Sequence, residues 1–318
     1  LTTFQKQQNI KDSVESFRKD TLKSGNGLLD PDLVEVLVLR SREAIDWLSE
    51  SEYGNNVDLS AISQLGGHSY PRTHRGSGKL PPGYAIISAL ERSIKNVEKL
   101  QLPNLQILKE TSLTKILTDK NHKVIGIQYT TAENTGEKKL LAQNVVLATG
   151  GYSADFEGSL SLLAKYRPDL LNFPLTNAVG TTGDGQKIAH RDVNAKYVHM
   201  NKIQVHPTGF IKVGQNTTGE KFKFLCGELV RGIGGVLISP QGTRFVDELT
   251  TRDVVTSAIE DHCDAHANTL QIPTHQKVAV VALTHKDYLK APSHIDFYLS
   301  QKLMYKSSFE GLKNALRD

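Results

Sequence analysis

The chain has 318 residues, of which 38% are hydrophobic and 23% are charged, and its formal net charge is +4. This length allows more than one hydrophobic core, so we expect two domains. No lysine-arginine block or interleaving of aromatic and basic residues indicates a nucleic-acid partner. No apolar run approaches the roughly 20 residues that a membrane-spanning helix needs.

The first hundred residues predict two helices joined by a glycine-rich loop. Asp30 and Pro31 offer a cap and a first-turn proline, and the apolar residues that follow recur at helical spacing to about Ser49. A second helix is marked by Ile86, Ile87, Leu90, Ile94 and Val97. The loop between them, residues 66–83, carries four histidine or arginine side chains: His68, Arg72, His74 and Arg75. These side chains suit either a solvated surface loop or a binding site.

The middle of the chain predicts a short antiparallel meander that returns into a main sheet. Its strands are expected at 113–117, 124–131 and 140–149, with polar turns around Asn121 and at 134–136. The last strand would present the ligand-facing residues Ala148, Thr149, Gly150 and Gly151, because paired glycines let a backbone approach a ligand closely. A similar segment precedes the next helix and consists of Thr182, Gly183, Asp184 and Gly185.

After about Asn201 the predicted elements become shorter. A turn at 240–243 follows a strand at 236–239, and residues 278–284 predict a buried strand between helical stretches. This pattern favours a smaller α+β domain.

The two cysteines, Cys226 and Cys263, show neither Cys-x-x-Cys spacing nor a histidine partner pattern. Neither a disulfide framework nor a metal site is therefore expected. We expect Cys226 to be a buried small side chain rather than a nucleophile.

One short region concentrates groups suited to a small dicarboxylate. Guanidinium groups match carboxylates with paired hydrogen bonds, and Arg231 and Arg252 supply two of them. Glu228 precedes Arg231 by three residues, so the two share a face of any helical turn. Reduction of an alkene also requires a proton at the second carbon. Because the pKa of free guanidinium is above about 12, Arg252 needs neighbours that return its proton, and Glu228 and Arg231 are the candidates.

Each of these elements also has a plainer interpretation. An isolated Glu-x-x-Arg or Arg-Asp pair is usually a solvated surface pair that contributes little stability, and a lone His-Pro is usually a turn. The ordered set with its flanks favours a site.

The joint pattern resembles a known family. The segments 206–209, 228–235 and 244–253, together with 66–83, 148–151 and 182–185, are similar to the soluble fumarate reductase family of flavoproteins, which is related to succinate dehydrogenase flavoprotein subunits. The similarity is closest to the yeast-type members and covers roughly residues 1 to 310. It implies a mixed α/β fold: residues 1–200 as part of a Rossmann-like FAD-binding domain, and 201–318 as a smaller α+β capping domain that holds substrate.

The resemblance also implies a role for each motif. Arg252 would donate the proton, with Glu228 and Arg231 as its relay, while His206, Thr208 and Arg252 bind fumarate or succinate. Ala148 to Gly151, Thr182 to Gly185, and Gly66, Gly67 and His68 would face FAD. In the cytochrome-linked relatives a threonine before the glutamate touches substrate, but Gly227 stands there in this chain. The implied location is intracellular, either cytoplasmic or mitochondrial.

Some family segments do not occur in this sequence. These are the N-terminal strand with Gly-x-Gly-x-x-Gly, which places a pyrophosphate on a helix N-terminus, and later segments with a second substrate histidine and an arginine. We therefore expect the sequence to be an internal portion of a longer flavoenzyme, incomplete for catalysis and a weak binder of flavin by itself. Two alternatives stay open: a related flavoprotein that acts on another unsaturated or dicarboxylic acid, and a fragment without activity. The sequence indicates neither the electron donor nor the oligomeric state.

Overall fold

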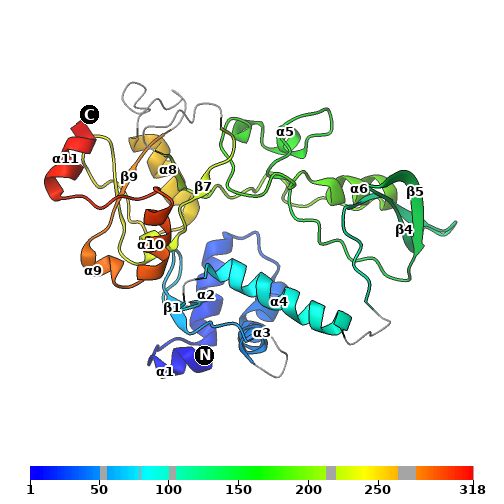
Figure 1. Ribbon diagram of the computed structural model, residues 1–318, viewed down its shortest axis with the longest axis horizontal. Coiled ribbons are helices and arrows are strands. Elements are labelled where there is room, and N and C mark those ends of the chain that lie inside the picture. Colours follow the sequence, from blue (N-terminus) through cyan, green and yellow to red (C-terminus); the bar gives the residue numbers. More distant parts are fainter. Residues whose placement is uncertain (51–55, 79, 100–104, 213–219, 264–276, 318) are drawn as a thin grey trace. The chain divides into compact units, whose positions relative to one another are not determined.

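The computed structural model describes residues 1–50, 56–78, 80–99, 105–212, 220–263 and 277–317 (Figure 1). The chain forms two compact units. Unit 1 comprises Leu1–Pro103, Val205–Gly219 and Phe224–Asp318, and unit 2 comprises Asn104–Gln204 and Glu220–Lys223. The sequence predicted a boundary near residue 200 between a FAD-binding domain and a capping domain. The two units are defined by contacts and do not test that boundary, which stays a prediction.

The N-terminal part of unit 1 is helical. Its helices are α1 (Thr3–Gln7), α2 (Val14–Gly25), α3 (Pro31–Ser49) and α4 (Pro82–Lys99). Asp30 caps α3 by accepting hydrogen bonds from the amides of Asp32 and Leu33, which confirms the predicted start. The loop predicted at residues 66–83 is shorter in the structure. β2 (Thr73–Arg75) lies within it and pairs antiparallel with β1 (Ala61–Ser63), and α4 already begins at Pro82.

The C-terminal part of unit 1 alternates short strands and helices. β6 (Gly209–Phe210) pairs with β7 (Phe224–Leu225), and β8 (Val236–Ile238) pairs antiparallel with β9 (Val280–Ala282), which confirms the predicted strand near 280. The helices are α7 (Leu229–Gly232), α8 (Arg252–His262), α9 (His285–Tyr288), α10 (Pro292–Ser300) and α11 (Phe309–Arg317).

Two buried clusters hold this part together. One joins α8 to β8 and consists of Leu237, Val255, Ile259 and Cys263. The other joins α7 to α10 and includes Cys226, Val230, Ile295 and Tyr298. Burial raises the pKa of Cys226 to about 12, so this thiol stays protonated at neutral pH. That agrees with a packing side chain rather than a nucleophile.

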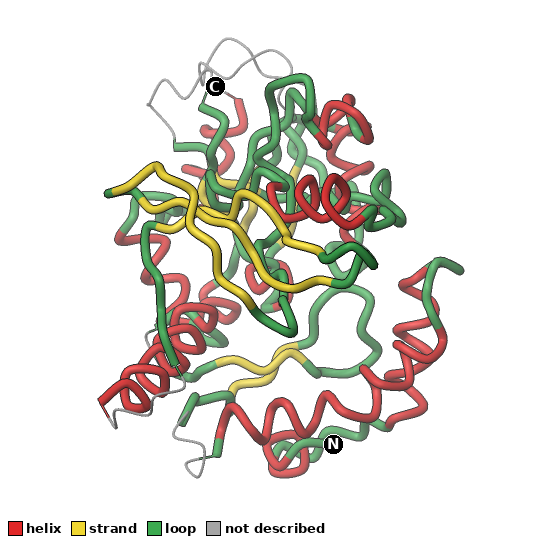
Figure 2. The backbone as a smooth tube through the Cα atoms, turned by 90° about the vertical axis from the view of Figure 1, so that its right-hand side faces the viewer, coloured by secondary structure: helices red, strands yellow, loops and turns green. Residues whose placement is uncertain are grey.

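Unit 2 is built on one antiparallel sheet. Its strands β3 (Thr111–Thr118), β4 (Val124–Thr131) and β5 (Asn134–Leu141) lie in the order β3-β4-β5. They are among the strands drawn in yellow in Figure 2. α6 (Asp184–Val193) packs on β3, where Asp192 accepts a hydrogen bond from the amide of Ile116 at 2.8 Å. A helix α5 (Leu162–Tyr166) and a 3₁₀ turn (Pro168–Leu170) complete the described elements.

The predicted third strand of the meander was wrong. β5 ends at Leu141, and residues 142–150 form no strand. Asn134 and Gly136 suggested a turn, but the hairpin turn is Ala132-Glu133, because Thr131 pairs with Asn134. Every residue of β5 is exposed, so this strand does not show the half-buried alternation from which strands are predicted. The apolar run 145–147 instead suggested a strand, yet Val146 is 88% exposed.

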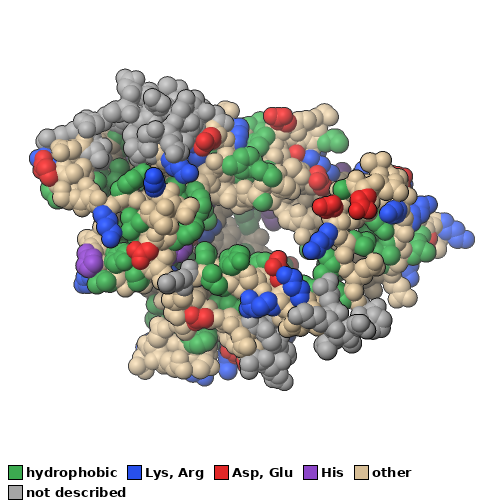
Figure 3. All heavy atoms as spheres, in the orientation of Figure 1, with side chains coloured by type: hydrophobic (Ala, Val, Ile, Leu, Met, Phe, Trp, Pro, Cys, Tyr) green, Lys and Arg blue, Asp and Glu red, His purple; other side chains and the backbone are tan. Residues whose placement is uncertain are grey.

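The described helices include none long and apolar enough to cross a membrane. Among the same residues, no group of three or more His, Cys, Asp or Glu could hold a metal ion. On the face shown in Figure 3, lysine and arginine side chains are interspersed with aspartate and glutamate.

Adjacent valines on α8 provide a matched test of the unit 1 core. Val255 is fully buried, whereas Val254 is 47% exposed. Val255→Ala should lower the free energy of unfolding by about 2 kcal/mol, because it removes buried methyl groups and leaves a cavity. Val254→Ala should be neutral or slightly stabilising, because alanine has the higher helix propensity. Chemical denaturation of both variants measures the difference, and equal effects would contradict this packing.

Candidate active site

Glu228 is the centre of the candidate site in unit 1. It is the N-cap residue of α7, and its side chain is 9% exposed. Its Oε2 accepts a hydrogen bond from Arg252 Nε at 2.8 Å, and its Oε1 accepts one from the Gly66 amide at 2.8 Å. Burial opposes ionisation, but these hydrogen bonds outweigh it and hold the pKa of Glu228 below its usual value. Glu228 is therefore an anion fixed at both oxygens.

Arg252 is the first residue of α8, and its side chain is 39% exposed. The N-cap residue Thr251 forms no side-chain cap bond. The guanidinium and the positive end of the helix dipole therefore favour an anion at the same place.

Arg231 lies one helical turn from Glu228, as their spacing predicts, and its side chain is 1% exposed. Its Nη1 donates to the carbonyl of Glu248 at 2.9 Å. Its Nη2 lies 4.0 Å from Glu228 Oε2, and neither Nε nor Nη2 has a hydrogen-bond partner among the described residues. The ion pair from Glu228 to Arg252 is thus a direct hydrogen bond, whereas Arg231 approaches Glu228 at 4.0 Å without one.

The motif that contains Arg252 also has a structural role that the sequence did not reveal. Arg244 binds both carboxylate oxygens of Glu248, at 3.1 Å and 2.6 Å. Glu248 Oε1 also accepts the Leu237 amide of β8 at 2.9 Å. The buried Glu248 therefore ties the motif to the sheet while its carbonyl holds Arg231.

His206 and Thr208 lie on the segment that leads into β6. Burial, and then the charges of Arg252 and Arg231, lower the pKa of His206 to about 4, so the ring is neutral at pH 7. Its Nδ1 lies 3.1 Å from the carbonyl oxygen and 3.3 Å from the amide nitrogen of Thr208, so the tautomer decides whether this nitrogen donates or accepts. The Thr208 hydroxyl donates to the carbonyl of Cys226 at 2.9 Å, an internal bond that holds this segment beside Glu228. The contact of either side chain with substrate stays a prediction.

The loop residues Gly66 and Gly67 face the protein through their amides. Gly66 donates to Glu228, and Gly67, at φ +78°, donates to the carbonyl of Leu249 at 3.1 Å. A Cβ on Gly66 would lie 2.4 Å from the carbonyl oxygen of Thr250. Spacing in the sequence does not reveal this contact, since Gly66 and Glu228 are 162 positions apart. The predicted contact of Gly66, Gly67 and His68 with FAD is not tested by these bonds.

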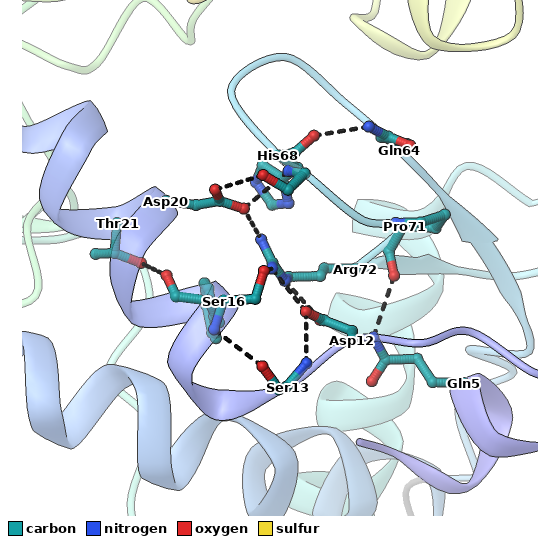
Figure 4. Close-up of polar contacts among 12 residues, drawn as sticks. Gln5, Asp12, Ser13, Ser16, Asp20, Thr21, Gln64, His68, Pro71 and Arg72 are labelled. Carbon is teal, nitrogen blue, oxygen red and sulfur yellow. Dashed lines mark hydrogen bonds and ion pairs between the residues drawn. The ribbon is translucent and has the colours of Figure 1, made fainter.

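Arg72, in the same loop, is held in a buried cluster with Asp12 and Asp20 (Figure 4). The sequence marked Arg72 only as one of four histidine or arginine residues of the loop, and the two aspartates carried no motif. His68 lies beside this cluster in Figure 4. Burial, and then the charge of Arg72, lower the pKa of His68.

Gly227, at the position where the cytochrome-linked relatives carry threonine, is engaged by Tyr298. The Gly227 amide donates to the Tyr298 hydroxyl at 3.1 Å, and a Cβ on Gly227 would lie 3.1 Å from that oxygen. His294 Nε2 lies 2.9 Å from the same hydroxyl. The backbone entering Glu228 is thus fixed by an aromatic side chain from α10.

In unit 2 the two glycine-rich segments meet. The Gly183 amide donates to the carbonyl of Gly151 at 3.1 Å. Gly150 and Gly183 have φ of +76° and +74°, a conformation that favours glycine. A Cβ on Gly185 would lie 1.9 Å from Thr149 Oγ1. The structure therefore brings 148–151 and 182–185 together at the start of α6, and glycine permits their close approach.

Comparisons with known proteins agree with the motifs. A family model described as "FAD binding domain" matches residues 2–298. Fumarate reductase 1 of Saccharomyces cerevisiae is 39% identical over 307 residues, which cover 96% of this chain and 61% of that protein. Fumarate reductase of Schizosaccharomyces pombe is 38% identical over 256 residues, which cover 80% of this chain and 48% of that protein.

A solved structure, the open conformation of a flavocytochrome c3 fumarate reductase, matches with a TM-score of 0.69 and 28% identity. The match covers 100% of this chain and 50% of that chain. This chain therefore spans about half to three fifths of the length of these proteins. The matches confirm the resemblance and the mixed α/β fold class, and they show that the chain belongs to the FAD binding domain family.

Proposed function

We propose that this chain takes part in the reduction of fumarate to succinate within a FAD-dependent enzyme, with Arg252 as the proton donor. The observation that carries the proposal is the Glu228 carboxylate, held at 2.8 Å by Arg252 and at 2.8 Å by the Gly66 amide. Similarity to fumarate reductases from two yeasts supports the choice of substrate. A carboxylate bonded to a partly exposed arginine provides both an anchor for a dianion and a route for a proton.

The proton transfer follows from the arrangement of the three charged groups. As negative charge develops on a substrate carbon, Arg252 releases a proton toward it; ionised Glu228 then takes up a proton from solvent by way of Arg231 and passes it to Arg252 through the bond to Nε. The buried Arg231 stabilises ionised Glu228, and its Nε and Nη2, which have no hydrogen-bond partner among the described residues, are available to pass a proton. Glu228 has a lowered pKa, so above that pKa it begins each cycle ready to accept a proton.

Substrate binding would use the positive side of the same site. Arg252 and the N-terminus of α8 attract one carboxylate. His206 is neutral at pH 7, and in the tautomer whose Nδ1 accepts the Thr208 amide it carries its proton on Nε2 and can donate it to the second carboxylate without a charge of its own. The pairing of one cation with one neutral donor avoids excess positive charge around the developing carbanion.

The described part of unit 2 fits a cofactor at its glycine-rich segments. Space for a Cβ on Gly151 is open, with nothing within 4 Å, and Gln186 Oε1 is buried without a hydrogen-bond partner among the described residues. Gly183 begins α6 without a side-chain cap, so backbone amides there can meet an anionic or carbonyl group. Ala148 to Gly151 and Thr182 to Gly185 would hold FAD. When bound and reduced, FAD supplies the hydride.

Three expectations from the sequence remain predictions. These are the action on another unsaturated or dicarboxylic acid, the loss of activity in a fragment, and the cytoplasmic or mitochondrial location. A panel of unsaturated acids tested with the flavin-loaded enzyme distinguishes the first from fumarate reduction.

The proton donor is tested by Arg252→Lys in the flavin-loaded enzyme. Turnover of fumarate should fall at least about 100-fold, because general acid catalysis contributes that much or more. Flavin content and inhibition by succinate should change much less, since the proton is needed in the transition state. Arg40→Lys, at an exposed ion pair with Glu43 on α3, is the matched control. Retention of more than about a tenth of wild-type turnover would remove Arg252 from the acid role.

The relay is tested by Glu228→Gln, which keeps the size of the side chain but cannot accept a proton. Turnover should fall strongly while succinate inhibition stays nearly intact. Glu43→Gln, an exposed glutamate on α3, should leave both unchanged. Equal losses of turnover and of succinate binding would show that Glu228 only positions the site.

The cofactor surface is tested by two glycines whose Cβ positions are both open. Gly151→Val should reduce retention of FAD, because the added side chain would occupy the proposed cofactor surface. Gly180→Val, also with nothing within 4 Å, should leave retention unchanged. Flavin absorbance per protein after gel filtration measures both, and circular dichroism checks folding. Full flavin content in Gly151→Val would contradict the assignment.

A further inference from the structure

The loop of residues 64–75 touches the candidate proton relay at one point. The Gly66 amide donates to Glu228 Oε1 at 2.8 Å. A hydrogen bond to a carboxylate is directional and weakens steeply when its geometry is lost. Gly66 can approach only because it lacks a Cβ, which would lie 2.4 Å from the carbonyl oxygen of Thr250. The position of this loop therefore decides whether Glu228 keeps its second hydrogen-bond donor.

The other end of the loop is fixed to α2 and the segment before it by a buried ion cluster (Figure 4). Arg72 donates from Nε and Nη2 to Asp12 at 2.6 Å and 2.7 Å, and from Nη1 to Asp20 at 2.5 Å. The side chain of Arg72 is 6% exposed, and those of Asp12 and Asp20 are 6% and 13% exposed. One guanidinium thus bridges two carboxylates, a geometry that lysine cannot reproduce.

Asp20 is also bonded directly to the loop backbone. Its Oδ2 accepts the Ser69 amide at 2.8 Å, and its Oδ1 accepts the Ser69 hydroxyl at 2.7 Å. Burial opposes ionisation of Asp20, but hydrogen bonds from Arg72 and Ser69 lower its pKa to about 2. The Asp20 carboxylate therefore stays ionised, and keeps its bonds to the loop, throughout the pH range in which an enzyme works.

Only two residues separate Ser69 from Gly66, and that stretch is folded into a tight turn. The His68 amide donates to the carbonyl of Leu65 at 3.2 Å, and the Gln64 side chain donates to the carbonyl of His68 at 2.7 Å. The Gly67 amide is also held by the carbonyl of Leu249 at 3.1 Å, so this stretch is a short, bonded connection between Ser69 and Gly66 rather than slack chain.

We propose that the Asp12–Arg72–Asp20 cluster is a positioning device, which holds the 64–75 loop so that the Gly66 amide stays hydrogen-bonded to Glu228. This inference rests on the proposed function, because Glu228 is the relay carboxylate. A buried ion cluster is weak evidence for stability, since desolvation offsets its attraction. Its use here is to fix a backbone donor on a catalytic carboxylate.

The charged and titratable groups that act on Glu228 come from several elements. Arg252 and Arg231 lower its pKa, and the His206 and His68 rings, both with lowered pKa, interact with its charge. Loss of the Gly66 donor should raise the pKa of Glu228 by roughly one pH unit, which corresponds to one hydrogen bond to an ionised group. Ionised Glu228, and with it the relay, would then be lost at a higher pH.

Asp20→Ala separates this mechanism from simple electrostatics. Removal of a negative charge alone would lower the pKa of Glu228, whereas release of the loop would raise it. The pKa is read from the infrared carboxyl band that is absent in Glu228→Gln, and from the acid limb of the pH dependence of kcat. The positioning device predicts an upward shift of both by roughly one unit, with little change in KM for fumarate.

Two further variants keep the test decisive if Asp20→Ala folds poorly. Gly66→Ala changes no charge and should raise the pKa of Glu228 in the same way. Asp20→Asn keeps an acceptor for Ser69 and should give a smaller upward shift. Glu35→Gln, which removes an acidic partner of Arg18 between α3 and α2, leaves the loop's attachments in place; it is the control and should not raise the pKa.

The outcomes distinguish this inference from the proposed function. An unchanged or lowered Glu228 pKa in Asp20→Ala and Asp20→Asn would overturn the positioning device, even if Glu228→Gln abolishes turnover. An upward shift of the infrared band, in an enzyme whose Glu228→Gln variant remains fully active, would support the positioning device and defeat the proposed relay.

Discussion

The site depends on one buried negative charge. Glu228 is desolvated, and an unpaired carboxylate there would be costly or would become protonated. Three groups from separate parts of unit 1 prevent this: the Arg252 guanidinium from α8, the Arg231 side chain from α7, and the Gly66 amide from the loop before β2. Glu228 can therefore stay ionised only when these three segments are folded around it. A side chain that must stay charged without water is also one that can exchange a proton with a defined partner.

The supports of these groups are themselves buried and polar. Arg231 is held by the carbonyl of Glu248, whose carboxylate is held by Arg244 and by the Leu237 amide. The backbone before Glu228 is held by the hydroxyl of Tyr298. Small movements of any of these parts would change distances at Glu228, so the geometry around this carboxylate depends on residues beyond those that bond it directly.

The sequence predicted most of what depends on local rules. The helix from Pro31 was found from its cap and apolar spacing, and the pairing of Glu228 with Arg231 follows from their separation along one helical turn. Contacts between distant segments could not be predicted, since nothing near Gly66 or Arg72 indicates Glu228 or Asp12. The third strand was misplaced for another reason. An exposed strand forms because its backbone hydrogen-bonds to the neighbouring strand. Its side chains show no buried face, so the hydrophobic pattern of the sequence does not locate it.

That exposed strand has a consequence for solubility. β5 lies at the edge of the sheet β3-β4-β5, so its outer amides and carbonyls offer a template on which another extended chain could add. Lys138 and Lys139 follow one another there, and successive side chains of a strand point to opposite faces. An approaching strand would have to bury a positive charge whichever face it aligned with, and lysine on an edge strand is a common means of preventing such pairing. The polar side chains that kept β5 from being predicted thus also disfavour pairing of this edge with another strand, and with it aggregation.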